Sequence, residues 1–504
     1  QIMKKINLNF LSLAVALLLF GACKTEYKIS ITEATNVNAP ALQSFTHGAN
    51  NGEWLLFAGR TNQKDDNGGI HDMTGDSNYA NTSFPPKSFN DSIYVYNPST
   101  DAKPTSISVS QLMGTILEKF TSYNADTLTK YIPVFKNTNS LVKQVDDYLY
   151  IVGGYGPKDL SAPTSNYITY NQIAKIHVPS MINLVKGNYS GVDEAKLFAF
   201  AQNAKLVSTG GELQYIGGTF YLVGGHNFGS TAANGQKYVD AVYPFSFNSS
   251  KTPLHALSIF VGTPISDVSD PNGASSDDTS IFRRRDGPIT PSLYYNSLEK
   301  KIEESIAIYA GVFKPGEDLQ AWNDAIYVHP NWDGDNNKLY TYDKAYDQKN
   351  YNVYSCPHVV AYDADSKVLH TFLLGGIGDG NTSKEVRLSG FTNTGTHIQL
   401  NVDGNPLQSK SSTFSQNLFG SSKTNKAPFY GAEAIFFPSN GFKAISQSSE
   451  IIDANTTFSN GVTDVEVGYI LGGIESFHSH PGTYGRTKSR ASNKVWKVTL
   501  TKSN

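Results

Sequence analysis

Short clusters of ionisable side chains are the parts of this 504-residue chain that could do chemistry. The run from Arg283 to Asp286 places three arginines before an aspartate, and arginine binds carboxylates and phosphates through two parallel hydrogen bonds. Cys356 stands two residues before His358, and these are the residue types of an activated thiol nucleophile. Tyr430 precedes Glu433, a carboxyl that could transfer protons. These stretches are the candidates for a catalytic or binding site.

Each cluster also has a plain structural interpretation. An arginine run is often a solvated loop in which one member pairs with its own acid, here Asp286. Its binding interpretation would be an acidic sugar or the acidic patch of a partner. A single cysteine at the start of a strand, such as Cys356, is more often a small buried apolar residue than a nucleophile. The sequence leaves these alternatives open.

Two further motifs resemble metal sites without completing one. His478 and His480 lie near Glu475, but no third ligand follows at a fixed spacing. The stretch from Asp333 to Asn337 begins like a calcium loop, although Lys338 occupies the position where that loop requires glycine. The sequence therefore predicts neither a metal site nor a cofactor.

The elements that must position these residues recur along the chain. Six strand-length apolar runs end in glycine, the residue that permits a positive φ and a close approach of backbones. They are Leu55–Gly59, Leu149–Gly154, Phe220–Gly225, Ala307–Gly311, Phe372–Gly376 and Tyr469–Gly473. A unit repeated at such long and uneven spacing predicts one small sheet copied around an axis, with loops of variable length.

A second recurring element follows these runs. It alternates apolar and polar residues, opens with Asn or Asp in several copies, and is closed by proline in several. The copies are Asn90–Pro98, Gln172–Pro179, Val239–Phe245, Asn323–Pro330 and Ser492–Val498. The fifth unit has no clean copy, and its best candidate is Thr396–Gly404. Short helices are expected within Gly114–Tyr131 and Ser180–Phe200.

This pair of elements resembles the kelch repeat, from about Tyr27 to Lys502, although the tryptophan of many kelch repeats is missing and two runs end in Ala-Gly. The resemblance implies an all-β fold, a six-bladed kelch-type β-propeller. The chain ends on a strand from Lys494 to Thr501, and Tyr27–Thr32 alternates like another strand. We expect these two to pair, because this pairing closes the ring and removes exposed sheet edges.

In such a blade, the connection from the fourth strand to the next blade and the connection from the second strand to the third emerge on one face. Residues at these connections should therefore converge around a polar mouth that suits a glycan or peptide. The predicted ligand-binding residues are His47, Arg60, Tyr155, His226, Arg285, Asp286, His358, Tyr430, Glu433 and Glu475, and Asp379 belongs to the same face.

The first residues are expected to be a targeting segment. Lys4 and Lys5 precede an apolar stretch from Leu8 to Phe20, which is followed by Gly21-Ala22-Cys23. This pattern resembles a bacterial lipobox and implies a signal peptide over residues 1–22, lipid attached to Cys23, and a single propeller domain over 23–504. Lys24 after the cysteine favours the outer membrane, on its periplasmic or cell-surface face. The alternative is an ordinary signal peptide cleaved nearby.

Charge and composition narrow the function. The formal charge of -3, without a basic stripe, argues against nucleic acid as a partner. A sequence rich in Asn, Lys, Tyr and Ser resembles surface lipoproteins of the Bacteroidetes. The first hypothesis is therefore a lipid-anchored binding or scaffold module that serves another outer-membrane or surface protein, or an extracellular glycan or peptide. The alternative is a carbohydrate-active enzyme that resembles sialic-acid mutarotases, in which Arg285, His358 and Glu433 would be catalytic. The sequence favours the module over the enzyme.

Overall fold

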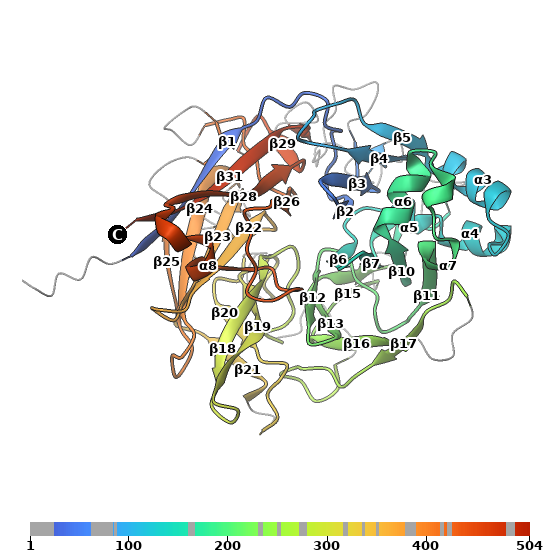
Figure 1. The fold of residues 1–504 in the computed structure, drawn as a ribbon. Coiled ribbons are helices and arrows are strands. Elements are labelled where there is room, and N and C mark those ends of the chain that lie inside the picture. The colour runs from blue at the N-terminus through green and yellow to red at the C-terminus, as the bar shows by residue number, and fades with distance from the viewer. Residues whose placement is uncertain are drawn as a thin grey trace, which may run out of the picture.

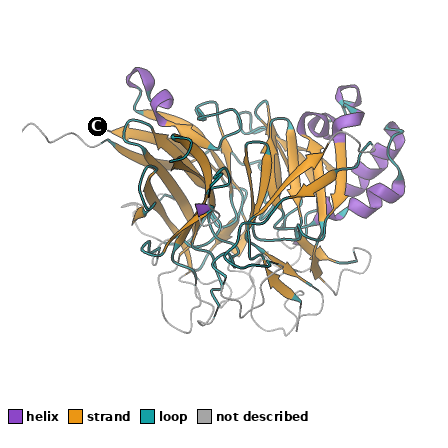
Figure 2. Ribbon diagram, turned by 90° about the horizontal axis from the view of Figure 1, so that it is seen from below, coloured by secondary structure: helices purple, strands orange, loops and turns teal. Residues whose placement is uncertain are grey.

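The computed structural model describes residues 25–61, 84, 88–159, 167–229, 235–248, 254–271, 280–315, 321–334, 338–348, 352–378, 390–413, 418–420, 426–479 and 489–503. In these residues six antiparallel sheets are arranged around a common axis, which confirms the predicted six-bladed propeller (Figure 1). Figure 2 shows the blades from the side, with most of the helices gathered at one edge of the molecule.

The blades follow the order of the chain, and strands run from the axis outwards. Blade 1 contains β2 (Thr46–Asn50), β3 (Glu53–Phe57), β4 (Ser92–Tyr96) and β5 (Thr105–Ser108). Blade 2 contains β6 (Leu141–Val145), β7 (Tyr148–Val152), β10 (Gln172–His177) and β11 (Phe198–Gln202). Blade 3 contains β12 (Glu212–Ile216), β13 (Thr219–Val223), β16 (Tyr243–Asn248) and β17 (Ser258–Val261).

Blade 4 contains β18 (Ile289–Asn296), β19 (Lys301–Tyr309), β20 (Ala325–Val328) and β21 (Tyr340–Asp343). Blade 5 contains β22 (His358–Asp363), β23 (Val368–Gly378), β24 (Gly390–Asn401) and β25 (Ser409–Thr413). Blade 6 contains β26 (Ile435–Pro438), β28 (Asp464–Leu471), β31 (Val495–Ser503) and, as its outermost strand, β1 (Glu26–Glu33). Short hairpins β8 (Tyr155–Pro157) with β9 (Tyr167–Thr169), β14 (His226–Phe228) with β15 (Gln236–Tyr238), and β29 (Ile474–Ser476) with β30 (Ser489–Ala491) extend three blades.

The apolar runs that end in glycine form the second strand of every blade, and the glycines are needed where these strands leave the sheet. Gly153 and Gly154 have φ values of +68° and +91°. A Cβ atom at Gly153 would lie 2.0 Å from the carbonyl oxygen of Ser208, which belongs to the connection into blade 3. The glycine therefore allows adjacent blades to touch backbone to backbone.

The N-terminal strand closes the ring as expected. β1 pairs antiparallel with β31 over eight residue pairs, from Glu26 with Ser503 to Glu33 with Trp496. Its inward side chains Tyr27 and Ile29 are buried in the core between blades 5 and 6. Blade 6 is thus completed by strands from both ends of the described chain.

Helices cover the outer side of blades 1 and 2. α3 (Val109–Lys119), α4 (Ala125–Tyr131) and α5 (Pro133–Lys136) connect the two blades, and α6 (Val178–Val185) and α7 (Glu194–Leu197) join the last two strands of blade 2. Ser108 begins α3 through a capping box with Gln111. The helices pack in one apolar cluster with strands of both blades, so they broaden the core here.

No helix among the described residues is long and apolar enough to cross a membrane. The predicted signal peptide and Cys23 lie outside the described residues.

Replacing Ile29 by alanine should destabilise the closure strand. Ile29 is 1 % exposed, so the change creates a cavity that costs about 2–4 kcal/mol in the free energy of unfolding. Denaturant unfolding followed by tryptophan fluorescence measures this difference. The control, Ser30→Ala, changes an exposed neighbour and should stay within about 0.5 kcal/mol of the unmodified chain. Equal stabilities for the two variants would contradict the closure.

Candidate functional site

A ring of six residues, one from each blade, surrounds the propeller axis on one face. Each stands two or three residues before the innermost strand of its blade. These residues, named here the collar, are Ser44, Asn139, Gly210, Asp286, Ser355 and Glu433.

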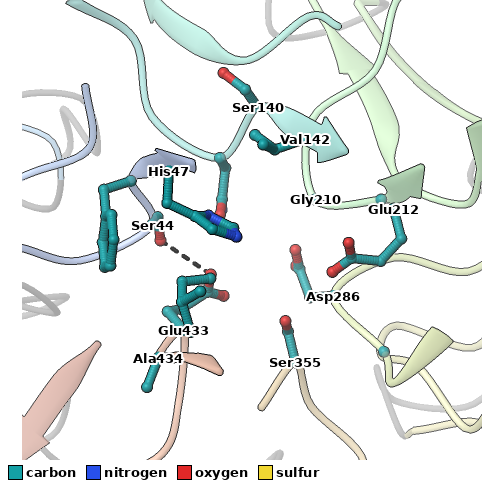
Figure 3. A pocket seen from close by; sticks show the side chains of 15 residues that line it. Ser44, His47, Ser140, Val142, Gly210, Glu212, Asp286, Ser355, Glu433 and Ala434 are labelled. Atoms are coloured by element: carbon teal, nitrogen blue, oxygen red, sulfur yellow. Dashed lines mark hydrogen bonds between the residues drawn. The ribbon is translucent and has the colours of Figure 1, made fainter. Parts of the chain in front are cut away.

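Backbone hydrogen bonds join the collar from blade to blade. The N–H groups of Asn139, Gly210 and Asp286 donate to the preceding member at 3.1, 3.4 and 2.8 Å. Ser355 donates to the Asp286 carbonyl at 2.7 Å, and Glu433 donates to the Ser355 carbonyl at 3.2 Å. The Ser44 hydroxyl completes the ring by donating to Glu433 Oε2 at 3.0 Å (Figure 3). The collar is thus one continuous hydrogen-bonded circle.

Most collar residues adopt a left-handed backbone conformation. The φ values of Ser44, Asn139, Asp286 and Glu433 lie between 50° and 58°, and that of Gly210 is 68°. Left-handed φ is uncommon for residues other than glycine, and such residues are often held in place at functional sites. The repeated conformation turns the chain from each connection into the innermost strand.

A polar cavity of about 70 Å³ lies on the axis beside the collar. Besides collar residues it is lined by His47, Ser140 and Glu212, which come from the starts of three innermost strands. Figure 3 shows the side chains of Glu212, Asp286 and Glu433 pointing into this space from blade 3, from the entry to blade 4 and from the entry to blade 6. The propeller therefore brings three carboxyls from distant parts of the sequence to one cavity.

Burial holds protons on these carboxyls. Burial, and then the charge of Asp286, raises the pKa of Glu433 to about 7. Burial raises the pKa of Asp286 to about 6 against the opposing effect of Arg285. Burial and the charges of Glu433 and Glu450 raise the pKa of Glu212 to about 8. Carboxyls with such values exchange protons near neutral pH, which suits either acid–base chemistry or a ligand that binds the ionised form.

Two histidines of the innermost strands stay neutral. Burial lowers the pKa of His47, in β2, to about 4. Burial likewise lowers the pKa of His358, the first residue of β22, although Glu450 opposes the shift. Near pH 7 neither imidazole supplies a positive charge to balance the carboxyls.

A hairpin over residues 443–453 crosses the propeller axis, at the ends of the innermost strands away from the collar. The axial space between this crossing and the collar is named here the channel. Its second strand, β27 (Ile451–Asp453), pairs parallel with β22 of blade 5. Its tip reaches blade 2, the opposite blade of the ring, where Glu450 Oε2 lies 2.5 Å from Lys143 Nζ. Gln447 also donates to Asp146, at 3.2 Å. In Figure 1 this segment runs through the middle of the ring. The hairpin therefore occupies the axis on the side away from the collar.

Lys143 keeps Glu450 ionised at this crossing. Burial opposes ionisation of Glu450, but the lysine outweighs it and lowers the pKa of the carboxyl. The side chain of Lys143 is buried, whereas that of Glu450 remains half exposed within the channel. The pair joins blades 2 and 5 through the hairpin.

Of the predicted ligand-binding residues, His47, Asp286 and Glu433 line the cavity, and the others lie elsewhere. Arg285 and His226 meet on the same face, with Arg285 Nη1 3.1 Å from the histidine ring nitrogens. Their contact brings together one residue that precedes an innermost strand and one that follows a glycine run. Burial, together with the Arg285 charge, lowers the pKa of His226 well below its usual value.

The remaining predicted residues contact the protein itself. Arg60 is buried, donates to Gln43 Oε1 at 3.1 Å, and stacks over the ring of Phe84. Tyr155 belongs to an aromatic cluster with Phe84 and Tyr167. Arg60 and Tyr155 therefore both pack against Phe84.

Tyr430 and Glu475 form a buried pair in blade 6. The Tyr430 hydroxyl donates to Glu475 Oε1 at 3.1 Å, and Arg490 Nε donates to Oε2 at 2.8 Å. Tyr430 also packs against Trp496. Asp379 lies outside the described residues.

The expectation of a solvated arginine run is wrong for two of its members. Arg283 is 3 % exposed and donates to the Phe313 carbonyl at 2.6 Å. Arg284 is 1 % exposed and pairs with Asp324 at 2.5 Å. Both side chains pack between blades 3 and 4, because the loop that carries them crosses the boundary between these blades. Arg285 is the most exposed of the three, with 18% of its side chain accessible, and its Nε lies 3.3 Å from Asp286 Oδ2.

Among the described residues no group of three or more His, Cys, Asp or Glu side chains is arranged to hold a metal ion. His480 and residues 335–337 of the incomplete calcium motif lie outside them.

No protein-family model matches the chain, and no curated protein matches it by sequence. Among solved structures, one described as "Structure of YjhT" is similar over 93% of this chain and 100% of that chain. Their TM-score is 0.42 and their sequence identity is 11%. At that distance no activity transfers from one chain to the other. The kelch and lipoprotein assignments therefore remain predictions.

Sequence reasoning missed four collar members, Ser44, Asn139, Gly210 and Ser355, and the cavity residue Glu212. Their only signal is position, two or three residues before each innermost strand or at its start. Their residue types differ from blade to blade, because the backbone makes the ring.

Glu433→Gln should change how stability depends on pH. The raised pKa means that Glu433 stabilises the fold fully below its unfolded pKa of about 4.3, and this contribution is lost as pH rises through about 7. The variant should therefore exceed the unmodified chain by on the order of 2–3 kcal/mol at pH 8 and lose this advantage near pH 4. Urea unfolding at both pH values measures the change. Glu26→Gln, at an exposed site, is the control, and a Glu433→Gln effect independent of pH would refute the assignment.

Cys356 should be unreactive in the folded protein. Burial raises the pKa of its thiol to about 12, so almost no thiolate exists at pH 8. In a Cys23→Ser chain, where Cys356 is the remaining cysteine, mass spectrometry should detect iodoacetamide labelling only after urea is added. Rapid labelling of the folded chain would restore the nucleophile hypothesis.

Proposed function

We propose that this chain is a binding module, and that the collar and axial cavity capture a hydrogen-bond donor of a glycan or peptide. The observation that carries the proposal is the convergence of Glu212, Asp286 and Glu433 on one cavity, while the 443–453 hairpin occupies the axis beyond. Carboxyls, serine hydroxyls and neutral histidine accept hydrogen bonds from hydroxyl or ammonium groups.

The size of the cavity supports binding of one functional group. At about 70 Å³ it is far smaller than the ~300–1,000 Å³ of typical small-molecule sites. A single ammonium or hydroxymethyl group fits, with the rest of the ligand outside the collar. A whole sugar ring does not fit.

The charge of the cavity favours a cationic or neutral ligand over an anionic one. Three carboxyls line it, and Arg285, the arginine next to Asp286, already contacts His226 and Asp286. An ammonium group would compensate the buried carboxylates, and a carboxylate ligand would add to their repulsion. The negative charge of the cavity therefore disfavours an acidic sugar, the ligand class considered for the arginine run Arg283–Arg285.

An amine-bearing ligand should bind more tightly as pH rises. The carboxyls must lose protons to pair with an ammonium group, and the pKa values of Asp286 and Glu433 are about 6 and about 7. Calorimetric titration with a glucosamine-terminated glycan should therefore give an affinity that increases from pH 5.5 to 7.5. Its N-acetylated counterpart is the matched ligand and should show little pH dependence.

Glu433→Gln and Asp286→Asn should each weaken binding of the amine by roughly 10-fold or more, since a hydrogen bond to a charged group contributes about 1.5–3 kcal/mol. Equal affinities for the amine and its acetylated form would contradict the proposed function.

The same proposal places the module on the outer membrane, attached through lipid on Cys23 and serving an envelope partner. The pattern at residues 1–23 supports this location. Pull-down from gently solubilised membranes should recover a partner in stoichiometric amount. Cys23→Ser should release the chain from the membrane fraction, and a chain that stays membrane-bound would contradict lipid attachment.

One observation favours the enzymatic alternative, an activity of the sialic-acid mutarotase type, although the size and the charge of the cavity count against an acidic sugar ring inside it. Glu433 and Asp286 are carboxyls with pKa values near neutrality, as acid–base catalysts require. NMR exchange between sugar anomers tests this. Exchange that is catalysed and then lost in Glu433→Gln would establish the enzyme.

A further inference from the structure

A second hollow lies over blade 2, on the same face as the collar. It has a volume of about 750 Å³, within the ~300–1,000 Å³ range of small-molecule sites. We call it the blade-2 groove, and its lining includes Lys130, Ile168, Asn171, Gln172, Gln202 and Asn227. None of its lining residues also lines the axial cavity.

Four amide side chains characterise this groove. Gln172 begins β10 and Gln202 ends β11, and the two are direct partners in the antiparallel register. Their side chains therefore leave the sheet on one side. Gln202 Nε2 donates to Asn171 Oδ1 at 3.2 Å, and Asn227 enters from β14 of blade 3. The groove is thus bordered by two blades and by the α4–α5 segment.

The side-chain amide of Gln172 is fixed in place, but its oxygen has no hydrogen-bond partner among the described residues. Its side-chain nitrogen donates to the Lys130 carbonyl at 2.6 Å, which fixes the orientation of the amide. The residue is 7 % exposed, and Gln172 Oε1 has no hydrogen-bond partner among the described residues. An unpaired buried acceptor destabilises the protein, so a donor arriving from a ligand would recover the lost hydrogen bond.

The chemistry of the groove suits hydroxyl groups. Amide side chains both donate and accept hydrogen bonds, as sugar hydroxyls do. Ile168, Pro133 and Tyr170 add apolar surface, which fits the C–H face of a sugar ring. Lys130 and Lys158 are offset in part by Asp159, and no arginine is among the described residues that line the groove. A strongly anionic ligand would call for arginine forks.

We infer that the blade-2 groove is a separate binding site for a neutral oligosaccharide. The amides bind its hydroxyls, and Gln172 Oε1 accepts from one of them. This site does not require the axial cavity to bind anything.

The test uses a printed array of neutral oligosaccharides of three to six sugars, followed by calorimetry on those that bind. The variant Gln202→Ala/Asn227→Ala changes two side chains outside the buried core, so folding should persist, as circular dichroism would check. We expect it to lose affinity by roughly 10-fold or more, because the ligand loses its hydrogen bonds to two amide side chains. Asn50→Ala, at the far end of β2, is the matched amide control and should bind as the unmodified chain does.

Two outcomes would overturn the inference. One is that no neutral oligosaccharide binds, and the other is that binding is unchanged in the Gln202→Ala/Asn227→Ala chain. Glu433→Gln separates the two sites. Binding lost in Glu433→Gln and kept in the groove variant would assign the glycan to the axial cavity and refute the groove.

Discussion

The hydrogen-bonded collar is the interaction on which the rest of the molecule depends. In a propeller each blade touches only its neighbours, so the geometry at the axis must be set by contacts that pass from blade to blade. Five backbone hydrogen bonds and the Ser44–Glu433 bond form such a circle. At five of the six collar positions the chain turns into the innermost strand through a left-handed residue, and Ser355 is the exception. The same turn aims the carboxyls of Asp286 and Glu433 at the axis.

The collar has a counterpart at the other end of the channel. The 443–453 hairpin extends blade 5 inward by one strand and reaches Lys143 on the opposite side of the ring. Its ion pair places charge on the axis, and the cavity carboxyls respond to it: Glu450 helps to raise the pKa of Glu212, and Lys143 opposes this effect. The hairpin inserted between β26 and β28 therefore both connects blades 5 and 2 and influences the pKa of Glu212 in the cavity.

Residues of similar type in the sequence have different environments in the fold, because the boundaries between blades decide which of them are buried. Three consecutive arginines divide into two that fasten blades 3 and 4 and one that stays on the mouth. Cys356 and His358 are near in sequence, yet the thiol packs under Gly376 while the imidazole belongs to the innermost strand. Cys356 precedes the strand that begins at His358, so strand geometry does not put the two side chains on one face, and packing decides which of them remains available.

The sequence by itself determined the six repeated sheets, the second and third strands of the blades and the closure between Tyr27–Thr32 and the C-terminal strand. These follow from local pattern, since apolar periodicity and glycine at strand ends need no knowledge of distant residues. The sequence pattern also predicted that His47, Asp286 and Glu433 lie at the mouth of the propeller, and these three residues line the axial cavity. Only the tertiary structure decided that Ser44, Asn139, Gly210 and Ser355 join them, that Glu212 completes the carboxyl cluster, and that a hairpin from blade 6 occupies the axis. The physical reason is that backbone hydrogen bonds between blades, and the burial that shifts a pKa, both depend on which distant segments come into contact. The type of a residue does not by itself predict such contacts.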